Sequence, residues 1–384
     1  MKICLVGLHS LSVLAPENQD QMVGGEPVQQ TLLARALARR GHEVSMVVAD
    51  LGQADGAQYG GIRTFKAYRP DAGVPVLRFI HPRCSGLWSA LARADADLYY
   101  TSCAGMEVGL LAMFCRHFGK RFVFRSASDT DCDRSRLLVR HARDRWLYGY
   151  GLRRADAILV QSASQAQTLR RSYGLESRVA GMLVEPPLSA PTHELDVLWV
   201  GNIRRVKRPD RVLWLASRLP RVAMHMVGGA LPGEEALYAR VRNGAAACAN
   251  LTFHGPLSYL EATDLYGRAR VLLNTSEVEG FPNTYLQAWI RGVPVVTLID
   301  PDRVIEREGL GVAVRSPGEL VGALASLLGS PQAWQAASER CRRFMAREFG
   351  EDRILPAYLD TFALVMHAGR RGLVAMPSSE VPHV

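Results

Sequence analysis

The stretch Asn274–Val296, NTSEVEGFPNTYLQAWIRGVPVV, carries the clearest fold signal in this chain of 384 residues. A short apolar run, Val271–Leu273, ends at Asn274 and predicts a buried strand. An acidic loop follows, a helix is expected to begin near Pro282–Asn283, and Val293–Val296 is predicted to be the next strand. The order strand, loop, helix, strand is the repeating unit of a parallel sheet covered by helices.

The loop and the helix start bring together groups that suit a sugar diphosphate. Pro282 fits the first helical turn, because its missing N–H would have no partner there. Glu279 can accept hydrogen bonds from hydroxyl groups, and Gln287, one turn inside the helix, offers both a donor and an acceptor. An anion can dock on the helix dipole and on the outward N–H groups of the first turn, those of Asn283, Thr284 and Tyr285.

Strands and helices alternate in the same way through the rest of the chain. Before the proline-rich segment Glu185–Asp196, strands are expected at Ile3–Val6, Val44–Val48, Leu98–Tyr100, Phe122–Phe124 and Ala157–Val160. After it, further strands are expected at Val197–Val200, Val222–Val227 and Leu251–Phe253. The sequence therefore predicts an α/β protein with two Rossmann-like domains, residues 1–190 and 191–350, a C-terminal helix over 351–369 and a disordered tail over 370–384.

The stretch around Glu279 resembles the C-terminal domain of family 4 glycosyltransferases, which have the GT-B fold and retain anomeric configuration. That family carries a Glu-x7-Glu motif of the form EGFxxxxxEA followed by GxPVV. This chain has Glu279-Gly280-Phe281, then Gln287-Ala288, and then Gly292-Val293-Pro294-Val295-Val296. The resemblance extends over about residues 1–365. It implies two parallel sheets that face each other across a cleft, with the C-terminal helix crossing back to the N-terminal domain.

The resemblance also implies roles for the residues of this motif. Glu279 would contact the hydroxyl groups of the donor sugar, and the second motif position would hold the nucleotide ribose. Gln287 stands there in place of glutamate and can bond a diol without charge. Phe281, Pro282, Asn283 and Thr284 would line the donor site around the helix start.

A cationic loop follows the first strand of the second half, at Val200–Arg208. Its sequence is VGNIRRVKR, and such a loop is suited to stabilise a leaving diphosphate. Family members read G-R-L-x-x-x-K-G here, so Gly201 and Lys207 match, whereas Asn202 occupies the position of the family arginine. Either Arg204 or Arg205 would then supply the missing charge.

Glycine-containing loops complete the predicted donor site. Gly24 and Gly25 precede a helix that is expected to begin near Glu26, where the resemblance implies a close backbone approach to the donor. The resemblance also implies that the loops holding Gly228 and Leu257 border the pocket of the nucleotide base. No metal or other cofactor is implied, because front-face transfer in this family depends on electrostatic stabilisation of the diphosphate.

The loop after Phe122–Phe124 lies where many family members place a histidine, and here it carries acidic residues instead. Asp129, Asp131 and Asp133 alternate along it. Two interpretations of Asp129 stay open: a group that orients the acceptor or binds sugar, and a plain N-terminal cap of the next helix.

Charge is distributed unevenly along the chain. The net charge is +9, and residues 1–190 hold 24 Lys and Arg against 17 Asp and Glu. A helix is expected over Ser135–Arg154, with an apolar stripe of Leu138, Ala142, Trp146 and Tyr150 and several arginines elsewhere. Its arginines either form a solvated face above a core-packed stripe or bind an anionic membrane or acceptor. No nucleic-acid-binding motif is present, so nucleic acid is not an expected partner.

Compartment and activity follow from these features. No window reaches the roughly 20 apolar residues of a membrane span, the start MKICLVGLHS leads straight into a strand, and seven cysteines are scattered without pairs. We expect a cytoplasmic protein, peripheral on the inner membrane face, that transfers a sugar from a UDP- or GDP-linked donor. The acceptor would be lipid-linked or a polysaccharide precursor.

Three other functions stay open at this point. The fold would also serve a small-molecule glycosyltransferase of secondary metabolism or a sugar-nucleotide epimerase. Incubation with UDP-sugars in the absence of an acceptor separates epimerisation from transfer. A donor-binding subunit that has lost catalysis is the remaining alternative, suggested by Asn202 and Gln287.

Overall fold

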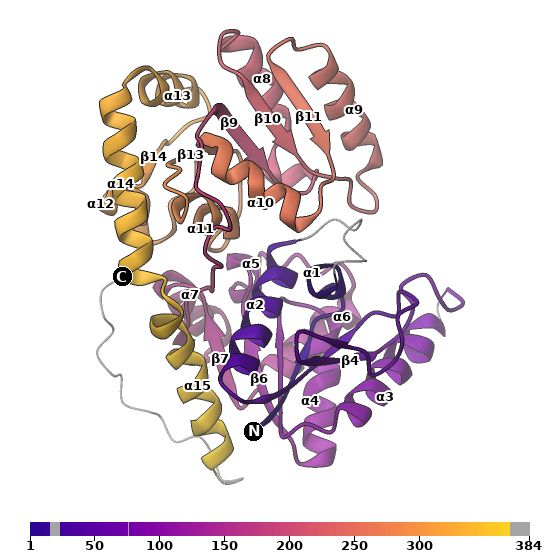
Figure 1. The fold of residues 1–384 in the computed structure, drawn as a ribbon. Coiled ribbons are helices and arrows are strands. Elements are labelled where there is room, and N and C mark those ends of the chain that lie inside the picture. Colours follow the sequence, from indigo (N-terminus) through magenta and orange to yellow (C-terminus); the bar gives the residue numbers. More distant parts are fainter. Residues whose placement is uncertain (16–23, 76, 369–384) are drawn as a thin grey trace. The chain divides into compact units, whose positions relative to one another are not determined.

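The computed structural model describes residues 1–15, 24–75 and 77–368, and it divides into two α/β units (Figure 1). The first unit comprises the described parts of Met1–Pro16, Glu26–Leu183 and Glu351–Val384. The second comprises Val184–Gly350, together with Gly24 and Gly25. The predicted tail, residues 370–384, lies outside the described residues.

The first unit is built on an eight-stranded sheet with the order β3-β4-β2-β1-β5-β6-β7-β8 among the described residues. Its strands pair in parallel except β3 with β4, and buried apolar runs such as Ile3–Val6 form its centre. The strands are β1 (Lys2–Val6), β2 (Glu43–Val48), β3 (Gln58–Tyr59), β4 (Ile62–Lys66), β5 (Leu98–Ser102), β6 (Arg121–Arg125), β7 (Ala157–Val160) and β8 (Arg178–Val179).

Helices connect these strands. They are α1 (Leu11–Leu14), α2 (Gly25–Arg39), α3 (Ser85–Ala94), α4 (Met106–Phe118), α5 (Asp129–Cys132), α6 (Ala142–Leu152) and α7 (Ala163–Tyr173), with short turns η2 (Leu77–Phe79) and η3 (Ile80–Cys84) before α3. The alternation predicted for the first half is therefore present.

The C-terminal helix α15 (Glu351–His367) belongs to the first unit, as the fold class requires. Its Tyr358 hydroxyl donates a 2.9 Å hydrogen bond to the carbonyl of Gly181, and Phe362 packs edge-on against Tyr100 with ring centroids 6.2 Å apart. Phe362 is fully buried, so apolar packing holds the chain end on this unit.

The helix predicted over Ser135–Arg154 is shorter than expected. α6 begins at Ala142, after an extended residue, His141, and the segment before it is irregular. The predicted apolar stripe is therefore wrong in three of its four positions: Leu138 is 62% exposed, Trp146 is 63% exposed, and Ala142 is exposed as well. Leu138 lies before the helix, where spacing by four residues selects no face. Within α6 the side chains that pack inward are Leu147, Tyr148 and Leu152, so the buried face is not the one that carries Trp146.

The second unit has a six-stranded parallel sheet with the order β11-β10-β9-β12-β13-β14 in the described part of the chain. The strands are β9 (Leu195–Val200), β10 (Met224–Val227), β11 (Leu251–Gly255), β12 (Ala269–Asn274), β13 (Val295–Thr297) and β14 (Gly311–Ala313). The connecting elements are η4 (Arg205–Lys207), α8 (Asp210–Arg218), α9 (Glu235–Ala246), α10 (Tyr259–Arg268), α11 (Asn283–Trp289), η5 (Pro301–Arg303), α12 (Val304–Glu308), α13 (Glu319–Gly329) and α14 (Pro331–Glu348).

The strand order positions the loops that carry chemistry. β9 lies between β10 and β12, and all three run in the same direction. Their carboxyl ends therefore meet at one edge of the sheet, where parallel sheets commonly bind ligands. Within the described residues, no helix is long and apolar enough to cross a membrane.

Candidate functional site

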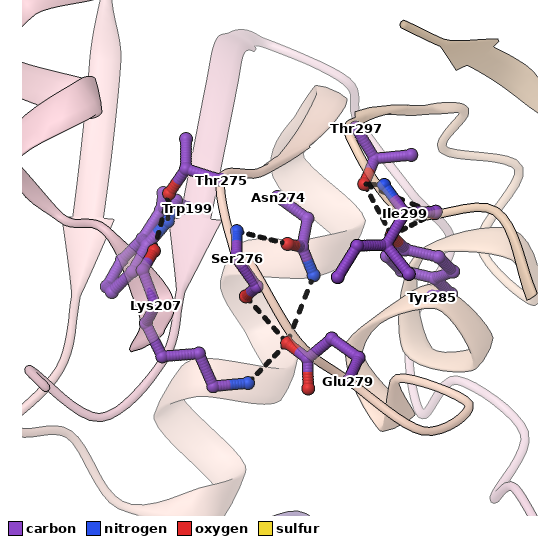
Figure 2. Close-up of polar contacts among 9 residues, drawn as sticks. All are labelled: Trp199, Lys207, Asn274, Thr275, Ser276, Glu279, Tyr285, Thr297 and Ile299. Atoms are coloured by element: carbon purple, nitrogen blue, oxygen red, sulfur yellow. Dashed lines mark hydrogen bonds and ion pairs between the residues drawn. The ribbon is translucent and has the colours of Figure 1, made fainter. Parts of the chain in front are cut away.

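A partly buried ion pair occupies the carboxyl edge of the second unit's sheet. Lys207, at the end of η4, donates to the Oε1 atom of Glu279, which lies in the loop between β12 and α11 (Figure 2). The two side chains are 20% and 12% exposed. The pair joins loops that are 72 residues apart, because β9 and β12 are neighbours in the sheet.

Two polar residues from the end of β12 complete the surroundings of Glu279. The Ser276 hydroxyl donates a 2.7 Å hydrogen bond to Glu279 Oε1, and Asn274 Nδ2 donates to the same oxygen at 3.4 Å. All three donors therefore converge on Oε1, as Figure 2 shows. The second oxygen, Oε2, receives none of these bonds, so it can accept a hydrogen bond from a ligand.

Glu279 is ionised in this setting. Burial alone would raise the pKa of its carboxyl group, but the Lys207 ammonium and the hydrogen bonds from Lys207, Ser276 and Asn274 together lower that pKa below its ordinary value. The site thus offers a fixed carboxylate beside a fixed cation at neutral pH. A hydroxyl group and a phosphate could be bound side by side there.

Hydrogen bonds from residues of the loop after β12, one of which is held in turn by β9, hold the backbone of the η4 loop at Val206 and Lys207. The Thr275 hydroxyl donates a 2.8 Å hydrogen bond to the Lys207 carbonyl, and Trp199 Nε1 donates to that hydroxyl at 2.9 Å. Glu277 N also donates to the carbonyl of Val206 at 2.8 Å. These contacts tie the η4 loop to the β12 loop, so the ion pair is preorganised rather than a chance surface contact.

The other cations of this loop differ in their partners. Arg208 is ion-paired with Asp210 and Glu277, which neutralises its charge locally. Arg204 is partly buried, and its Nε atom is a buried donor with no acceptor among the described residues. Arg205 is exposed and lines an open hollow with Arg208, Asp210, Leu237 and Arg240. Arg204 is therefore the loop arginine that lacks an acceptor for a buried N–H.

The start of α11 differs from the prediction in detail. Pro282 is the N-cap residue, with an extended backbone, and the helix of seven residues begins at Asn283, followed by Thr284. The N–H group of Tyr285 does not point outward, because it donates to the Pro282 carbonyl at 3.0 Å. The ring of Phe281 packs near Trp289 and Phe349, with centroids 6.1 and 6.0 Å away, so its side chain helps to fix the loop.

Gln287 lies in an internal network that the sequence did not reveal. Its Oε1 atom accepts a 3.0 Å hydrogen bond from Arg291, and its Nε2 atom donates to the Tyr259 hydroxyl at 3.4 Å. Gln287 and Arg291 are 4% and 3% exposed. The position that the resemblance assigns to ribose binding is thus occupied by a neutral amide that is held in place by a buried guanidinium.

The glycines of the edge serve close backbone packing. A Cβ atom on Gly228 would lie 2.0 Å from the carbonyl oxygen of Gly201, so only glycine fits there. Gly201 N donates to the Val227 carbonyl at 3.0 Å, and Gly228 N donates to the Gly255 carbonyl at 2.9 Å. Asn202 and the half-buried Leu257 lie in the loops that follow β9 and β11 at this edge.

In the first unit, Asp129 lies at the carboxyl edge of the sheet, but it is not the cap of α5. Ser128 is the N-cap, and Asp131 accepts from the backbone N–H groups of Ala127 and Ser128. Asp129 accepts a 2.9 Å hydrogen bond from Gln165 Nε2. Of the two interpretations left open by the sequence, the plain cap is therefore wrong for Asp129.

A second acidic group at this edge, Glu26 at the start of α2, was missed by the sequence analysis. It accepts hydrogen bonds from Ser102, at 2.9 Å, and from Gln30. Burial raises the pKa of Glu26 to about 7, the hydrogen bonds offset this only in part, and the charges of Glu107 and Asp131 add to the rise. The signal available in the sequence was an acidic residue in the first turn after a glycine pair.

We expect Glu26→Gln to stabilise the protein increasingly as pH rises. Because the folded-state pKa lies above the ordinary value of 4.5, the wild type loses stability between pH 4.5 and about pH 7. The variant does not ionise there, so its advantage should grow by roughly 1–3 kcal/mol across that window. Urea unfolding of both proteins at the two ends of the window measures this, and a constant difference would contradict the assignment.

Comparisons with known protein families agree with this architecture. The family model described as "Glycosyl transferase 4-like domain" matches residues 24–182, which lie in the first half of the chain. The model described as "Glycosyl transferases group 1" matches residues 194–330, which contain Lys207, Glu279 and Gln287. The two matches meet close to the point where the second unit begins.

Similar curated proteins carry the name D-inositol 3-phosphate glycosyltransferase. The protein from Mycolicibacterium paratuberculosis is 31% identical over 190 residues, which is 46% of this chain and 41% of the relative. The protein from Mycobacterium avium is 32% identical over 192 residues, covering 46% of this chain and 43% of the relative. The alignments thus span less than half the length of these curated relatives.

Solved structures with the same fold cover nearly the whole chain. Sucrose-phosphate synthase from Thermosynechococcus elongatus has a TM-score of 0.73 at 20% identity, over 94% of this chain and 99% of its own. The Anabaena protein HepE, solved with UDP and glucose, has a TM-score of 0.72 at 14% identity over 94% and 99%. The two family matches and this shared fold agree: the chain has the GT-B fold, with a glycosyl transferase 4-like domain over residues 24–182 and a glycosyl transferases group 1 domain over residues 194–330.

Proposed function

We propose that this glycosyltransferase uses a nucleotide-diphosphate sugar, UDP- or GDP-linked, and retains the anomeric configuration of the transferred sugar. The observation that carries the proposal is the preorganised pair of Glu279 and Lys207 at the sheet edge. Glu279 Oε2, which accepts none of the three internal hydrogen bonds, would bind a sugar hydroxyl group. The Lys207 ammonium would stabilise the negative charge that develops on the departing diphosphate.

The neighbouring proteins support this donor class. HepE was solved with UDP and glucose, and a variant of TarM from Staphylococcus aureus was solved with UDP and α-GlcNAc-glycerol. In this chain, Gly24, Gly25, Gly201, Asn202 and Leu257 would line the donor site together with Phe281, Pro282, Asn283 and Thr284. Gln287 would approach the ribose from its network with Arg291.

Retention is proposed to proceed by attack on the same face of the sugar that the diphosphate leaves. The acceptor oxygen forms the new glycosidic bond as the bond to the diphosphate breaks, and its proton passes to the departing phosphate oxygen. The protein then has to orient the two reactants and stabilise charge. No metal is required in this scheme, and Asp129 would orient the acceptor.

The acceptor is proposed to be a lipid-linked or polysaccharide-precursor hydroxyl group at an anionic membrane. The support is electrostatic: the segment from Asp133 to Arg154 holds seven arginines against two aspartates. Each arginine near an anionic bilayer contributes about 1 kcal/mol, screened over roughly 8 Å at physiological salt. The second candidate acceptor is a soluble phosphorylated molecule, because the similar curated proteins are named D-inositol 3-phosphate glycosyltransferase.

The deciding experiment pairs a donor screen with a transfer assay. Nucleotide sugars that bind should raise the melting temperature by mass action, and the best of them should then support transfer to a lipid extract and to inositol phosphate. The same incubation without acceptor detects epimerisation of the donor. Binding without turnover on any acceptor would instead support a donor-binding subunit that has lost catalysis.

We expect unequal effects from Arg204 and Arg205, the two arginines of the η4 loop that form no ion pair with the part of the chain that the structure describes. Arg204→Ala should lower transfer about ten- to hundredfold, because its buried Nε lacks an acceptor that a diphosphate oxygen would provide. Arg205→Ala should stay within a few fold of wild type, since that side chain lines a separate hollow. The steady-state rate of nucleoside-diphosphate release measures the activity of both variants. Negligible effects of both substitutions would show that Asn202, in place of the family arginine, marks a real loss of charge at this site.

A further inference from the structure

Large apolar side chains protrude from one region of the first unit. Among the described residues, the large apolar side chains that are at least 60% exposed are six in number, and five of them lie in two segments. The first segment, Gly73–Pro75 with Leu77–Arg83, precedes α3, and the second, Asp133–Arg154, contains α6. The five protruding side chains are Val74, Leu77, Ile80, Leu138 and Trp146.

The two segments touch each other. The Arg143 guanidinium lies over the Phe79 ring, 3.4 Å from its centroid. The first segment is also closed on itself, since Arg78 N donates to the Val74 carbonyl at 2.8 Å and Gly73 has a positive φ of 96°. The protruding residues therefore come from two touching segments of the first unit, and we name the surface that they form the Leu77–Trp146 surface.

Residues next to the protruding side chains in the sequence are buried in the core, so the protruding side chains point toward solvent. Leu137 is buried in the core of the first unit, so the adjacent Leu138 must face away from that core. Leu147 and Tyr148 pack inward in the same way next to Trp146. Trp146 is stacked on Tyr150 at a centroid distance of 5.7 Å, which orders the indole ring although solvent surrounds most of it.

Arginines surround these apolar groups, and most of their charge is uncompensated. Arg143 is paired with Asp144. Within the described part of the chain, Arg78, Arg140 and Arg145 have no carboxylate within ion-pair distance. Arginine side chains can bury their stems beside apolar groups while their heads reach toward phosphate, and indole rings favour the boundary between lipid and water.

We propose that the Leu77–Trp146 surface inserts Leu77, Ile80, Leu138 and Trp146 into the acyl-chain boundary of an anionic membrane. The arginines would then contact lipid phosphates around the inserted groups. This inference rests on the proposed function, in which the acceptor lies at an anionic membrane. It adds hydrophobic anchoring to the electrostatic attraction proposed there. An anionic bilayer fits better than a protein partner because it supplies both chemistries without requiring a matching set of carboxylates.

The test is co-sedimentation of the full chain with vesicles, without donor or acceptor, so that it is independent of sugar transfer. Vesicles of phosphatidylcholine alone are compared with mixed phosphatidylcholine and phosphatidylglycerol. Salt is set at about 0.1 M and about 1 M, where the Debye length falls from about 10 Å to about 3 Å. Attraction by charge disappears at high salt, whereas an inserted apolar anchor persists.

Three variants separate the contributions. Leu77→Ser with Trp146→Ser should lower binding at high salt by about tenfold or more, because two large apolar groups are lost. Arg140→Gln with Arg145→Gln should reduce binding mainly at low salt. Leu188→Ser is the matched control, because Leu188 is 90% exposed but lies in the second unit, away from these two segments of the chain. This variant should bind vesicles as the wild type does.

A second readout follows Trp146 itself. Lipids brominated in the acyl chains should quench part of the protein fluorescence, and that part should be absent in Trp146→Phe. All variants should keep the wild-type melting temperature, since exposed side chains add little to stability. Equal binding of the apolar double variant and the wild type at both salt levels would overturn the proposal. So would a wild-type dimer that Trp146→Ser converts to a monomer without any vesicle binding.

Discussion

Glu279→Ala is expected to lower sugar transfer by about a thousandfold or more. The substitution removes the carboxylate whose Oε2 atom would bind a donor hydroxyl, and it also leaves Lys207 without its counter-ion. Both losses act at the reacting centre rather than on substrate affinity alone, so kcat should fall more than KM rises. The acceptor-dependent rate of nucleoside-diphosphate release measures this loss of activity.

The fold should survive this substitution, because the Glu279 side chain belongs to a loop and not to the apolar core. Glu279→Gln is the conservative partner: it can still accept from Ser276 but has no charge to hold Lys207. Glu277→Gln is the matched control, because Glu277 lies two residues before Glu279 in the same loop. It is 47% exposed and pairs with Arg208 and Arg211 instead of Lys207. Near wild-type activity of Glu279→Ala with an intact fold would show that the donor site is elsewhere.

Lys207→Ala is expected to lower transfer by about a hundredfold. Its ammonium is held by Glu279, and its backbone is held by the hydrogen bond from the Thr275 hydroxyl to the Lys207 carbonyl. The charge is therefore already in place when the diphosphate departs. Losing it removes transition-state stabilisation and leaves the buried Glu279 carboxylate uncompensated, which raises the pKa of Glu279. The pH profile of kcat should accordingly shift its acidic limb upward.

Two control variants make this result specific. Lys207→Arg keeps the charge with a different geometry and should recover part of the rate. Arg208→Gln removes a neighbouring charge that is already neutralised by Asp210 and Glu277, and it should stay within a few fold of wild type. If Arg208→Gln and Lys207→Ala were equally impaired, general loop charge would explain the effect rather than the Glu279 partner.

The sequence identified features that depend on local order. The strand, loop and helix around Glu279 lie within one short stretch, so polar residues at a strand end and a proline at a helix start predict their own environment. The alternation of strands and helices likewise predicted two α/β halves. Asn274 and Ser276 could have been found by the same rule, because they too lie at or just after the end of β12.

Local patterns failed where tertiary packing decides at which residue a helix begins and which of its faces is buried. Leu138 and Trp146 were expected to lie on one buried helical stripe, yet both side chains are exposed. The helix begins only at Ala142, after Leu138, and within it Leu147 and Tyr148 pack inward instead of Trp146. The resemblance assigned Gln287 to the ribose, and only the structure shows that Arg291, one turn later, donates to its side-chain Oε1 atom. The sequence contained both residues without any indication of the direction in which each would point.

The sequence by itself determined the fold class, the second-unit motif and the cationic loop, because each depends on neighbours along the chain. Only the tertiary structure decided that Lys207 and Glu279 form one partly buried ion pair, since this follows from β9 lying next to β12 in the sheet. It alone distinguished Arg204 from Arg205 and set the raised pKa of Glu26. Burial and pairing are properties of the packed chain, and residues far apart in sequence create them.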